Sequence, residues 1–231
     1  MSGARARARS RRGSRPLFWL GTAMVTAGLV LLGWLAWQFW GTNWVADRHQ
    51  QEITQQLQRQ WRQELARGQA LTPKRVPQGQ ATALVRIPRF GRHYVVPVLQ
   101  GTSEDVLARG FGHFTGTAGP GQVGNYALAG HRVTHGEPLR DMPELRPGDK
   151  VIVETARTTY TYVLDTNPND LVVDFTQTWV IDPHPENPNP GGVQPSSSRR
   201  LITLATCSEL FHTNNRMIAF GHLVQKAPRV H

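Results

Sequence analysis

Near its N-terminus the chain contains a long apolar stretch with the length and composition of a membrane span. Residues 17–40 include no charged side chain over 24 positions, and a helix needs about 20 apolar residues to cross the bilayer core. The apolar part of a cleaved signal peptide is shorter, about 7–15 residues, and small residues follow it. Tryptophans instead crowd the end of this stretch, and tryptophan side chains collect at membrane interfaces. We therefore predict an uncleaved transmembrane anchor over residues 17–40, rather than a signal peptide or a buried globular helix.

A polar helical pattern follows the apolar stretch. Residues 46–67 are rich in helix-forming side chains. Apolar residues recur at every fourth position, at Ile53, Leu57, Trp61 and Leu65. This spacing predicts a helical stalk with one narrow apolar stripe, which packs on the following domain, on a second stalk or on lipid. Residues 68–80 contain Gly, Pro and Gln without periodicity, as linkers do, so we assign residues 45–80 to a stalk and linker.

From residue 81 onward, the pattern changes to short runs of β-branched and aromatic residues separated by Gly, Pro, Asn and Asp. The eight runs are 83–90, 93–100, 125–131, 150–156, 159–165, 178–182, 201–206 and 217–225. Short strands set off by turn residues indicate an all-β barrel or sandwich. We expect helix only near residues 103–109 and 138–145. Residues 182–198 contain five prolines and two adjacent glycines, which predicts a long loop.

The basic charge of the chain is concentrated at one end. Lys and Arg outnumber Asp and Glu by 26 to 16, and such an excess suggests a nucleic-acid or membrane-surface binder. However, six arginines lie within residues 1–16, directly before the apolar stretch. Cationic flanks stay on the cytoplasmic side during membrane insertion. We therefore interpret residues 1–16 as a cytoplasmic tail that contacts membrane lipid, place the chain beyond the anchor outside the cell, and expect no nucleic-acid partner.

The strongest candidate for a reactive site combines one cysteine with two polar residues at predicted strand ends. Cys207 is the single cysteine of the chain, which excludes an intrachain disulfide and a cysteine-rich zinc or iron–sulfur site. It follows the run LITLAT, whereas His131 ends the run NYALAG and Arg216 opens the strand predicted at MIAFGHLV. A thiol, an imidazole and a fixed cation are the groups that a nucleophilic site needs. A buried packing cysteine is the alternative interpretation.

These residues lie in sequence blocks that resemble the sortase family. The blocks are, in order, GNYALAGHR, GDKVIVET, TYTYVL and TLATC, with Arg216 nine residues after the cysteine. TLATC is similar to the TLxTC block of sortases, and the resemblance extends over about residues 80–225. It implies a mainly β fold, the sortase-type eight-stranded β-barrel over residues 81–225 with one or two short helices. It also implies that Cys207, His131 and Arg216 form the catalytic triad.

The resemblance implies a cysteine transpeptidase of the Gram-positive cell surface. Sortases cleave a C-terminal sorting signal of the LPXTG type between Thr and Gly, form a thioacyl-enzyme and transfer the acyl group to an amine, commonly of a peptidoglycan precursor. The implied partners are therefore surface proteins that carry a sorting signal, and the peptidoglycan amine. The arginine-rich start, the anchor, the AGHR block and the WVIDP segment are most similar to actinobacterial class E sortases, for which an LAXTG-type signal is implied.

The resemblance also assigns a substrate groove. In sortases the long loop that leads into the cysteine strand forms one wall of the groove for the sorting signal, and residues 168–199 occupy that place in this sequence. The residues expected to contact the substrate are Leu171, Val172, Val173 and Thr206. No cofactor and no metal are expected.

Other functions fit parts of the pattern. An L,D-transpeptidase also uses His and Cys on peptidoglycan, but these residues lie close together in that family, whereas His131 and Cys207 are 76 residues apart. A non-catalytic anchored surface β-domain would not need the three candidate residues, and their joint presence argues against it. Gly119, Gly121 and Gly124 match GxGxxG, but no long strand precedes them and no helical pattern follows, which disfavours dinucleotide binding.

Overall fold

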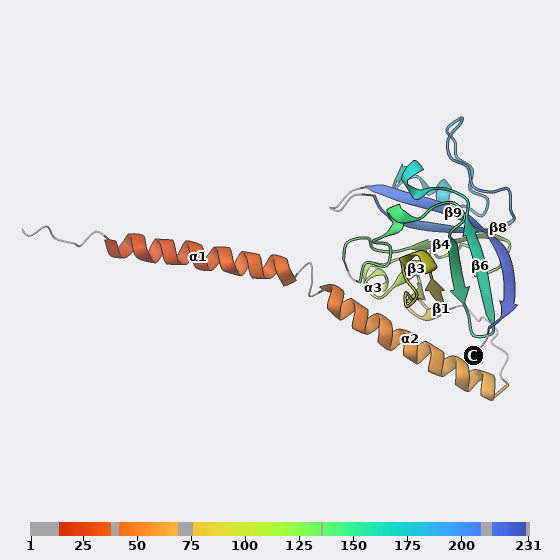
Figure 1. The fold of residues 1–231 in the computed structure, drawn as a ribbon, viewed down its shortest axis with the longest axis horizontal. Coiled ribbons are helices and arrows are strands. Elements are labelled where there is room, and N and C mark those ends of the chain that lie inside the picture. Colours follow the sequence, from red (N-terminus) through yellow and green to blue (C-terminus); the bar gives the residue numbers. More distant parts are fainter. Residues whose placement is uncertain (1–13, 38–41, 69–75, 135, 209–213, 230–231) are drawn as a thin grey trace, which may run out of the picture. The chain divides into compact units, whose positions relative to one another are not determined.

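A computed structural model describes residues 14–37, 42–68, 76–134, 136–208 and 214–229 (Figure 1). The chain divides into two compact units, residues 1–41 and residues 42–231. The first contains α1 (Ser14–Ala36), which is long and apolar enough over Pro16–Leu35 to cross a membrane. This helix agrees with the predicted span as far as the structure describes it, because residues 38–40 and most of the predicted tail lie outside the described residues.

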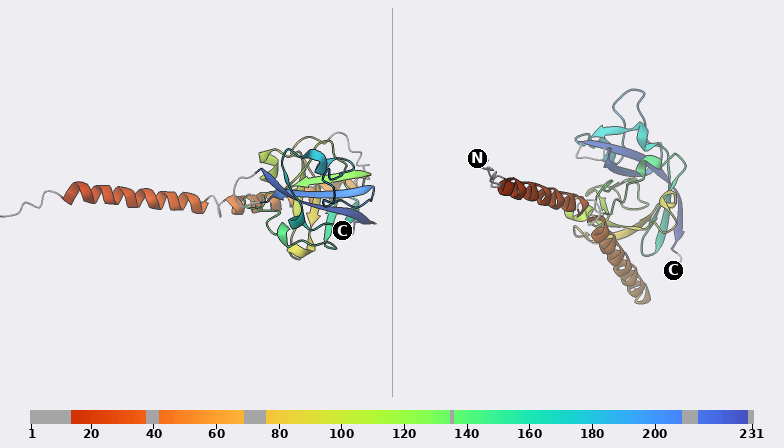
Figure 2. Two further views of the ribbon diagram at one scale, coloured as in Figure 1. Left: turned by 90° about the horizontal axis from the view of Figure 1, so that it is seen from above. Right: turned by 60° about the vertical axis from the view of Figure 1, so that its left-hand side comes forward.

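The second unit is built on a sheet that contains nine strands within the described residues. The strands are β1 (Ala81–Arg86), β2 (Val96–Gln100), β3 (Phe111–His113), β4 (Gly124–Ala129), β5 (Lys150–Glu154), β6 (Thr158–Leu164), β7 (Val172–Asp174), β8 (Arg200–Cys207) and β9 (Asn215–Pro228). Their order in the sheet is β6-β5-β1-β2-β3-β4-β8-β9-β7. A further pairing of β6 with β9 closes eight of them into a barrel and leaves β7 attached to β9 outside the ring (Figure 2). The predicted eight-stranded barrel is therefore confirmed.

Most strands coincide with the predicted runs, and the exceptions have local causes. The prediction of a strand at residues 178–182 was wrong, because η5 (Thr178–Ile181) is a 3₁₀ helix. The carbonyl oxygen of Val180 accepts hydrogen bonds from Asn125 Nδ2 and Thr203 Oγ1, both at 3.1 Å, so side chains of β4 and β8 satisfy this segment in place of a neighbouring strand. β3 and β7 were not predicted as separate strands, because three residues are too few to show an alternating pattern.

Side chains alternate between the two faces of each strand, and this places the apolar residues of the sheet in two layers. The barrel core contains large, fully buried residues from nearly every strand, among them Phe111, Tyr126, Tyr162 and Leu204. A second group lies on the outer face, formed by residues of β7, η5, β8 and β9 and by the residue just before β7. We call it the outer apolar cluster, and it consists of Leu171, Val173, Val180, Ala205, Ile218 and Phe220. Leu204 and Ala205 are consecutive yet belong to different layers, as expected for side chains that alternate between the faces of a strand.

The stalk packs on the barrel. α2 (Thr42–Ala66) places Leu57 and Trp61, which are 5% and 4% exposed, against Leu84 of β1 and Ala156. The guanidinium of Arg229 lies 4.7 Å from the centre of the Trp61 ring. Of the three partners left open for the apolar stripe, the structure therefore shows the domain itself, and Figure 1 shows α2 running beside the strands.

Short helices and one long loop complete the barrel. α3 (Glu104–Leu107) and η3 (Met142–Glu144) confirm the two short helical segments predicted from the sequence. Two further 3₁₀ turns are η2 (Pro88–Phe90) and η4 (Pro168–Asp170). Residues 182–198 contain no helix or strand, as predicted from their prolines and glycines.

Candidate active site

Cys207 and Arg216 lie side by side on neighbouring strands. Cys207 is the last residue of β8 and pairs directly with Arg216 near the start of β9. Two residues earlier in the same register, Ala205 pairs with Ile218, and both belong to the outer apolar cluster. Because side chains of one strand face the same side at every second position, the thiol and the guanidinium continue the row of this cluster. The cysteine side chain is half-buried.

The parallel pairing of β4 with β8 brings His131 to the same edge of the sheet. Ala129 pairs with Ala205, and the next backbone N–H, of Gly130, donates to the Ala205 carbonyl oxygen at 3.1 Å. Thr206 Oγ1 donates to the Gly130 carbonyl oxygen at 2.8 Å. His131 therefore lies two residues past the end of β4, at the same edge of the sheet where Cys207 ends β8. The two residues are far apart in the sequence and reach the same edge of the sheet because neighbouring parallel strands end on the same side.

Backbone contacts fold the segment after His131 back on itself. The N–H of Leu139 donates to the His131 carbonyl oxygen at 3.0 Å, and the Leu139 side chain is fully buried in the barrel core. The Arg132 guanidinium donates to the carbonyl oxygen of Ser208, the residue after the cysteine. Its Nε is buried without a hydrogen-bond partner. Arg132 therefore connects the histidine loop to the cysteine turn, a role that the sequence did not reveal although AGHR contains this residue.

A carboxylate lies near the candidate cation. Asp174 of β7 accepts hydrogen bonds from Thr176 Oγ1 at 2.6 Å and from the Thr176 N–H at 2.9 Å. These bonds, together with the positive charge of Arg216, lower the pKa of Asp174 below its usual value. Arg216 Nη1 also donates to the Asn215 carbonyl oxygen at 3.0 Å. The guanidinium thus lies in the field of an ionised carboxylate on the strand beside it.

The four residues expected to contact substrate occupy three kinds of position. Leu171 and Val173 are 7% exposed and belong to the outer apolar cluster, with Val173 paired opposite Arg216. Val172 is 47% exposed on the other side of β7. Thr206 is 2% exposed, and its hydroxyl donates a hydrogen bond to the Gly130 carbonyl oxygen. Their contact with a substrate stays a prediction.

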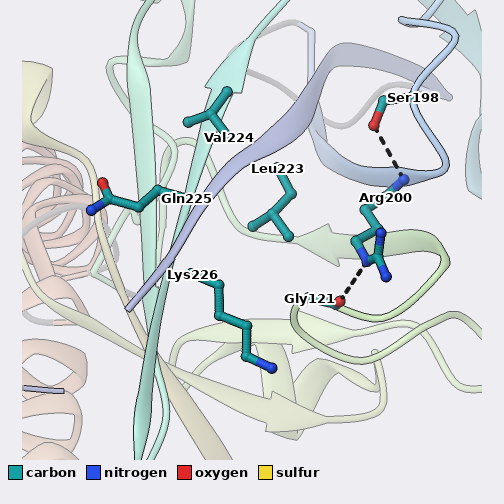
Figure 3. A pocket seen from close by; sticks show the side chains of 7 residues that line it. All are labelled: Gly121, Ser198, Arg200, Leu223, Val224, Gln225 and Lys226. Carbon is teal, nitrogen blue, oxygen red and sulfur yellow. Dashed lines mark hydrogen bonds between the residues drawn. The ribbon is translucent and has the colours of Figure 1, made fainter. Parts of the chain in front are cut away.

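A separate pocket of about 290 Å³ lies at the opposite end of β8 (Figure 3). Its lining residues are Gly121, Ser198, Arg200, Leu223, Val224, Gln225 and Lys226. Arg200 begins the strand that Cys207 ends, and its Nε donates to the Gly121 carbonyl oxygen at 3.2 Å. The lining contains no thiol and no imidazole, so this pocket is distinct from the candidate active site. Over the described parts of the chain, no group of three or more His, Cys, Asp or Glu side chains is arranged to hold a metal ion.

Comparisons with known proteins cover the barrel and the candidate site. The family model described as the sortase domain matches residues 85–224, which include all three candidate residues. Sortase SrtE1 of Streptomyces coelicolor is 35% identical over 222 residues, which are 91% of this chain and 58% of that protein. The chain therefore spans less than two thirds of the length of this curated relative.

Among solved structures, this chain is similar to those of class E sortases. The structure of sortase E from Streptomyces avermitilis is 40% identical, with a TM-score of 0.57 over 66% of this chain and 93% of that one. The crystal structure of Sortase E1 from Streptomyces coelicolor, with a tripeptide in the active site, is 34% identical, with a TM-score of 0.56 over 68% of this chain and 94% of that one.

Proposed function

This chain belongs to the sortase family, and from that membership we propose that it is a cysteine transpeptidase of the class E type. The observation that carries the proposal is the pairing of Cys207 with Arg216 on β8 and β9, with His131 two residues past the end of β4, the parallel neighbour of β8. The identity of 40% with the sortase E structure supports the class. The proposed triad is Cys207, His131 and Arg216.

In the proposed first step, Cys207 supplies the nucleophile. A free thiol has a pKa of about 8.5, so it reacts poorly unless cationic neighbours favour the thiolate. The Cys207 thiolate attacks the carbonyl carbon of the signal's Thr, and the bond from this carbon to the Gly nitrogen breaks. The His131 imidazolium gives its proton to the leaving amine. Arg216 keeps its proton under all conditions, so its part is to hold the substrate carbonyl and stabilise the developing oxyanion.

In the proposed second step, the thioester is resolved by an amine. The incoming amine attacks the thioester carbon and passes a proton to neutral His131, which restores the imidazolium. The C–S bond breaks, and the electron pair returns to Cys207 as thiolate. The acceptor that we propose is an amine of a peptidoglycan precursor, so that the product is a surface protein joined to the cell wall.

Substrate recognition is proposed on the outer face of the barrel. The signal is of the LAXTG or LPXTG type, and Leu171, Val172, Val173 and Thr206 are the proposed contact residues. Support comes from the outer apolar cluster, which ends in the row that contains Cys207 and Arg216. The cluster itself is buried, so Val172, which is 47% exposed, is the proposed contact residue with apolar surface that a side chain of the signal can cover.

The proposed location is the cell membrane. α1 acts as a single-pass anchor, the arginine-rich residues 1–16 stay in the cytoplasm, and the barrel faces outward. This proposal is supported by the apolar span at Pro16–Leu35 and by the arginines that precede it. The barrel would then meet secreted proteins that carry a sorting signal, and membrane lipid would surround α1.

Peptide cleavage tests the proposed function. The full chain in lipid nanodiscs is incubated with LAXTG-type and LPXTG-type peptides and an amine acceptor, and the products are identified by mass spectrometry. We expect cleavage between Thr and Gly, a thioacyl adduct on Cys207, and transfer of the acyl part to the amine. A folded protein that forms neither adduct nor product with either peptide contradicts the proposal.

A further inference from the structure

The tip of the loop that follows His131 is held by the stalk helix. Asn43, in the first turn of α2, donates from Nδ2 to Glu137 Oε1 at 2.6 Å. The backbone N–H of Gly136 donates to Asn43 Oδ1 at 3.1 Å. The Asn43 amide therefore binds both a side chain and the backbone of the loop, although Asn43 and Glu137 are 94 positions apart in the sequence.

The backbone of this loop tip lies directly on the surface of α2. Gly136 has φ of +77°, and a Cβ at this position would lie 2.5 Å from Gln50 Nε2 and 3.2 Å from Asp47 Oδ1. The Gln50 side chain is itself only 6% exposed. A larger residue would be strained at this φ and would have to displace the Gln50 amide. The loop backbone at Gly136 is therefore closely packed against the face of α2 that contains Asp47 and Gln50.

Glu137 adopts a backbone conformation that its surroundings must hold. Its φ is +45°, which makes it the single non-glycine residue with a positive φ in the described ranges. L-residues outside tight turns rarely adopt this conformation, and it persists where neighbouring contacts over-determine it. Two backbone hydrogen bonds hold Glu137 within the loop, from its N–H to the Thr134 carbonyl oxygen at 3.2 Å and from the Arg140 N–H to the Glu137 carbonyl oxygen at 3.0 Å. Its carboxylate contacts Asn43 through Oε1 and Arg140 Nη1 through Oε2, both at 2.6 Å. The Arg140 side chain is 70% exposed, so the part-buried Asn43 contact is the stronger of these two side-chain constraints.

Short-range contacts carry the position of the tip to His131. Two residues after Glu137, the N–H of Leu139 bonds to the His131 carbonyl oxygen at 3.0 Å. Between them, Tyr94 donates its hydroxyl proton to the Pro138 carbonyl oxygen. Leu139 is anchored in the core, and His131 is fixed to β8 through Gly130. Among the described residues of the loop, Gly136 and Glu137 lie between these anchored positions, and α2 contacts them through Asn43.

From this geometry we propose that the first turns of α2 position the histidine loop, with Asn43 as a positioning residue for His131. The stalk thereby forms part of the support of the active site. Asn43 belongs to the same compact unit as the barrel, so this support lies within that unit. The inference rests on the proposed function, because it assigns Asn43 to the reaction of Cys207 and His131.

A polarity exchange between Asn43 and Glu137 tests the proposal in the full chain in nanodiscs. Asn43→Asp keeps the acceptor for the Gly136 N–H but sets a carboxylate against Glu137. We expect kcat to fall about tenfold or more, with little change in KM, because an aligned hydrogen bond to a charged group is lost. Adding Glu137→Gln restores a donor and acceptor pair, since the new amide can donate to the carboxylate introduced at position 43, and should recover most of the lost kcat. Gln51→Ala, on the exposed side of the same helix, is the matched control and should behave as wild type.

The rate at which iodoacetamide alkylates Cys207 gives a second readout that needs no peptide. An imidazolium beside the thiol favours the thiolate, so displacing His131 should move the alkylation profile of Asn43→Asp to higher pH. Glu137→Gln in the double variant should move it back. If wild type cleaves no peptide but these shifts occur, the proposed signal is wrong and the positioning role stands. Wild-type kcat and alkylation profiles in Asn43→Asp, or no recovery in the double variant, overturn the inference whatever happens to Tm.

Discussion

Cys207 and His131 stand at strand ends, and neither side chain belongs to the barrel core or to the outer apolar cluster. We expect Cys207→Ala and His131→Ala to lower the rate of peptide cleavage by about three orders of magnitude or more, because each removes a reacting group. The thermal midpoint should change little, since no large buried side chain is lost. Cleavage is followed by mass spectrometry and folding by circular dichroism. Near-normal turnover in either variant would remove that residue from the mechanism.

Arg216 is expected to need its planar guanidinium as well as its charge. Lysine at this position keeps the positive charge near Asp174 but loses the fork of parallel donors. We expect Arg216→Lys to lower kcat/KM by about a hundredfold, the effect of losing one oxyanion donor. Arg199→Lys is the matched control, because Arg199 is exposed just before β8. A loss of less than threefold, on the order of the scatter between such measurements, would mean that charge alone suffices.

His113 gives the barrel a stability that depends on pH. Burial lowers its pKa below the ordinary value of 6.5, and a smaller opposing effect comes from the Ala118 carbonyl oxygen 3.0 Å from Nε2. The unfolded chain therefore takes up a proton at a higher pH than the folded one. The contribution of His113 to the free energy of unfolding is complete above about pH 6.5 and declines as the pH falls toward the lowered pKa.

Replacing this histidine tests the pH dependence. His113→Gln keeps hydrogen-bonding capacity without a titrating ring. We expect the fall in Tm between about pH 7.5 and pH 5 to be smaller in the variant than in wild type, because one source of proton uptake on unfolding is gone. Equal falls in Tm would show that His113 titrates alike in the folded and unfolded chains.

Among the elements of the barrel, the connection from η4 to β8 has two parts with different surroundings. Residues 168–182 include β7, whose Val173 pairs opposite Arg216. Residues 188–192 form the exposed tip of the long loop, enclosed by hydrogen bonds between Asn187 and Gln194. The first part therefore adjoins the site, whereas the second is bonded mainly to itself.

This division predicts separate effects on selectivity. Exchanging residues 168–182 for the matching segment of another sortase should change the ratio of kcat/KM for signals with Ala or Pro at the second position. Shortening residues 188–192 should leave that ratio unchanged. The ratio is measured with paired peptides in variants that are shown to be folded. The reverse result would mean that the exposed tip, and not β7, contacts the signal.

Across the whole molecule, residues 42–231 behave as one compact unit in which α2 covers part of the barrel. Removing residues 1–41 should leave a folded protein that cleaves soluble peptides. Removing residues 1–68 should lower Tm by about 10 °C, because Leu84 and Ala156 lose the cover of Leu57 and Trp61. Calorimetry of the two truncated chains checks this. Equal Tm values would show that the helix adds nothing to the stability of the barrel.

Two kinds of structure could be predicted from the sequence. The apolar run before Trp40 predicted α1, and the fourfold spacing of Ile53, Leu57, Trp61 and Leu65 predicted α2, because a helix repeats within a few residues. Seven of the eight apolar runs contain a strand, because the two-residue alternation of a strand is also visible within a few residues. The ordered blocks around His131 and Cys207 identified the family. The segment at Trp179 was predicted as a strand because its composition resembles one, but the side chains of Asn125 and Thr203 set its conformation.

The apolar span and the mainly β domain could be predicted from the sequence alone because they depend on local pattern, and the candidate triad could be named because the sequence blocks around it resemble those of sortases. Which strand ends share an edge depends on the tertiary fold, through the parallel pairing of β4 with β8 that brings His131 and Cys207 to the same edge of the sheet. The tertiary fold also decided that α2 packs on the barrel and that Asn43 holds the loop at Gly136 and Glu137. These contacts join residues far apart in the chain. They form only when loop closure, close approach at a glycine and hydrogen-bond geometry agree at once, and no short sequence window contains that information.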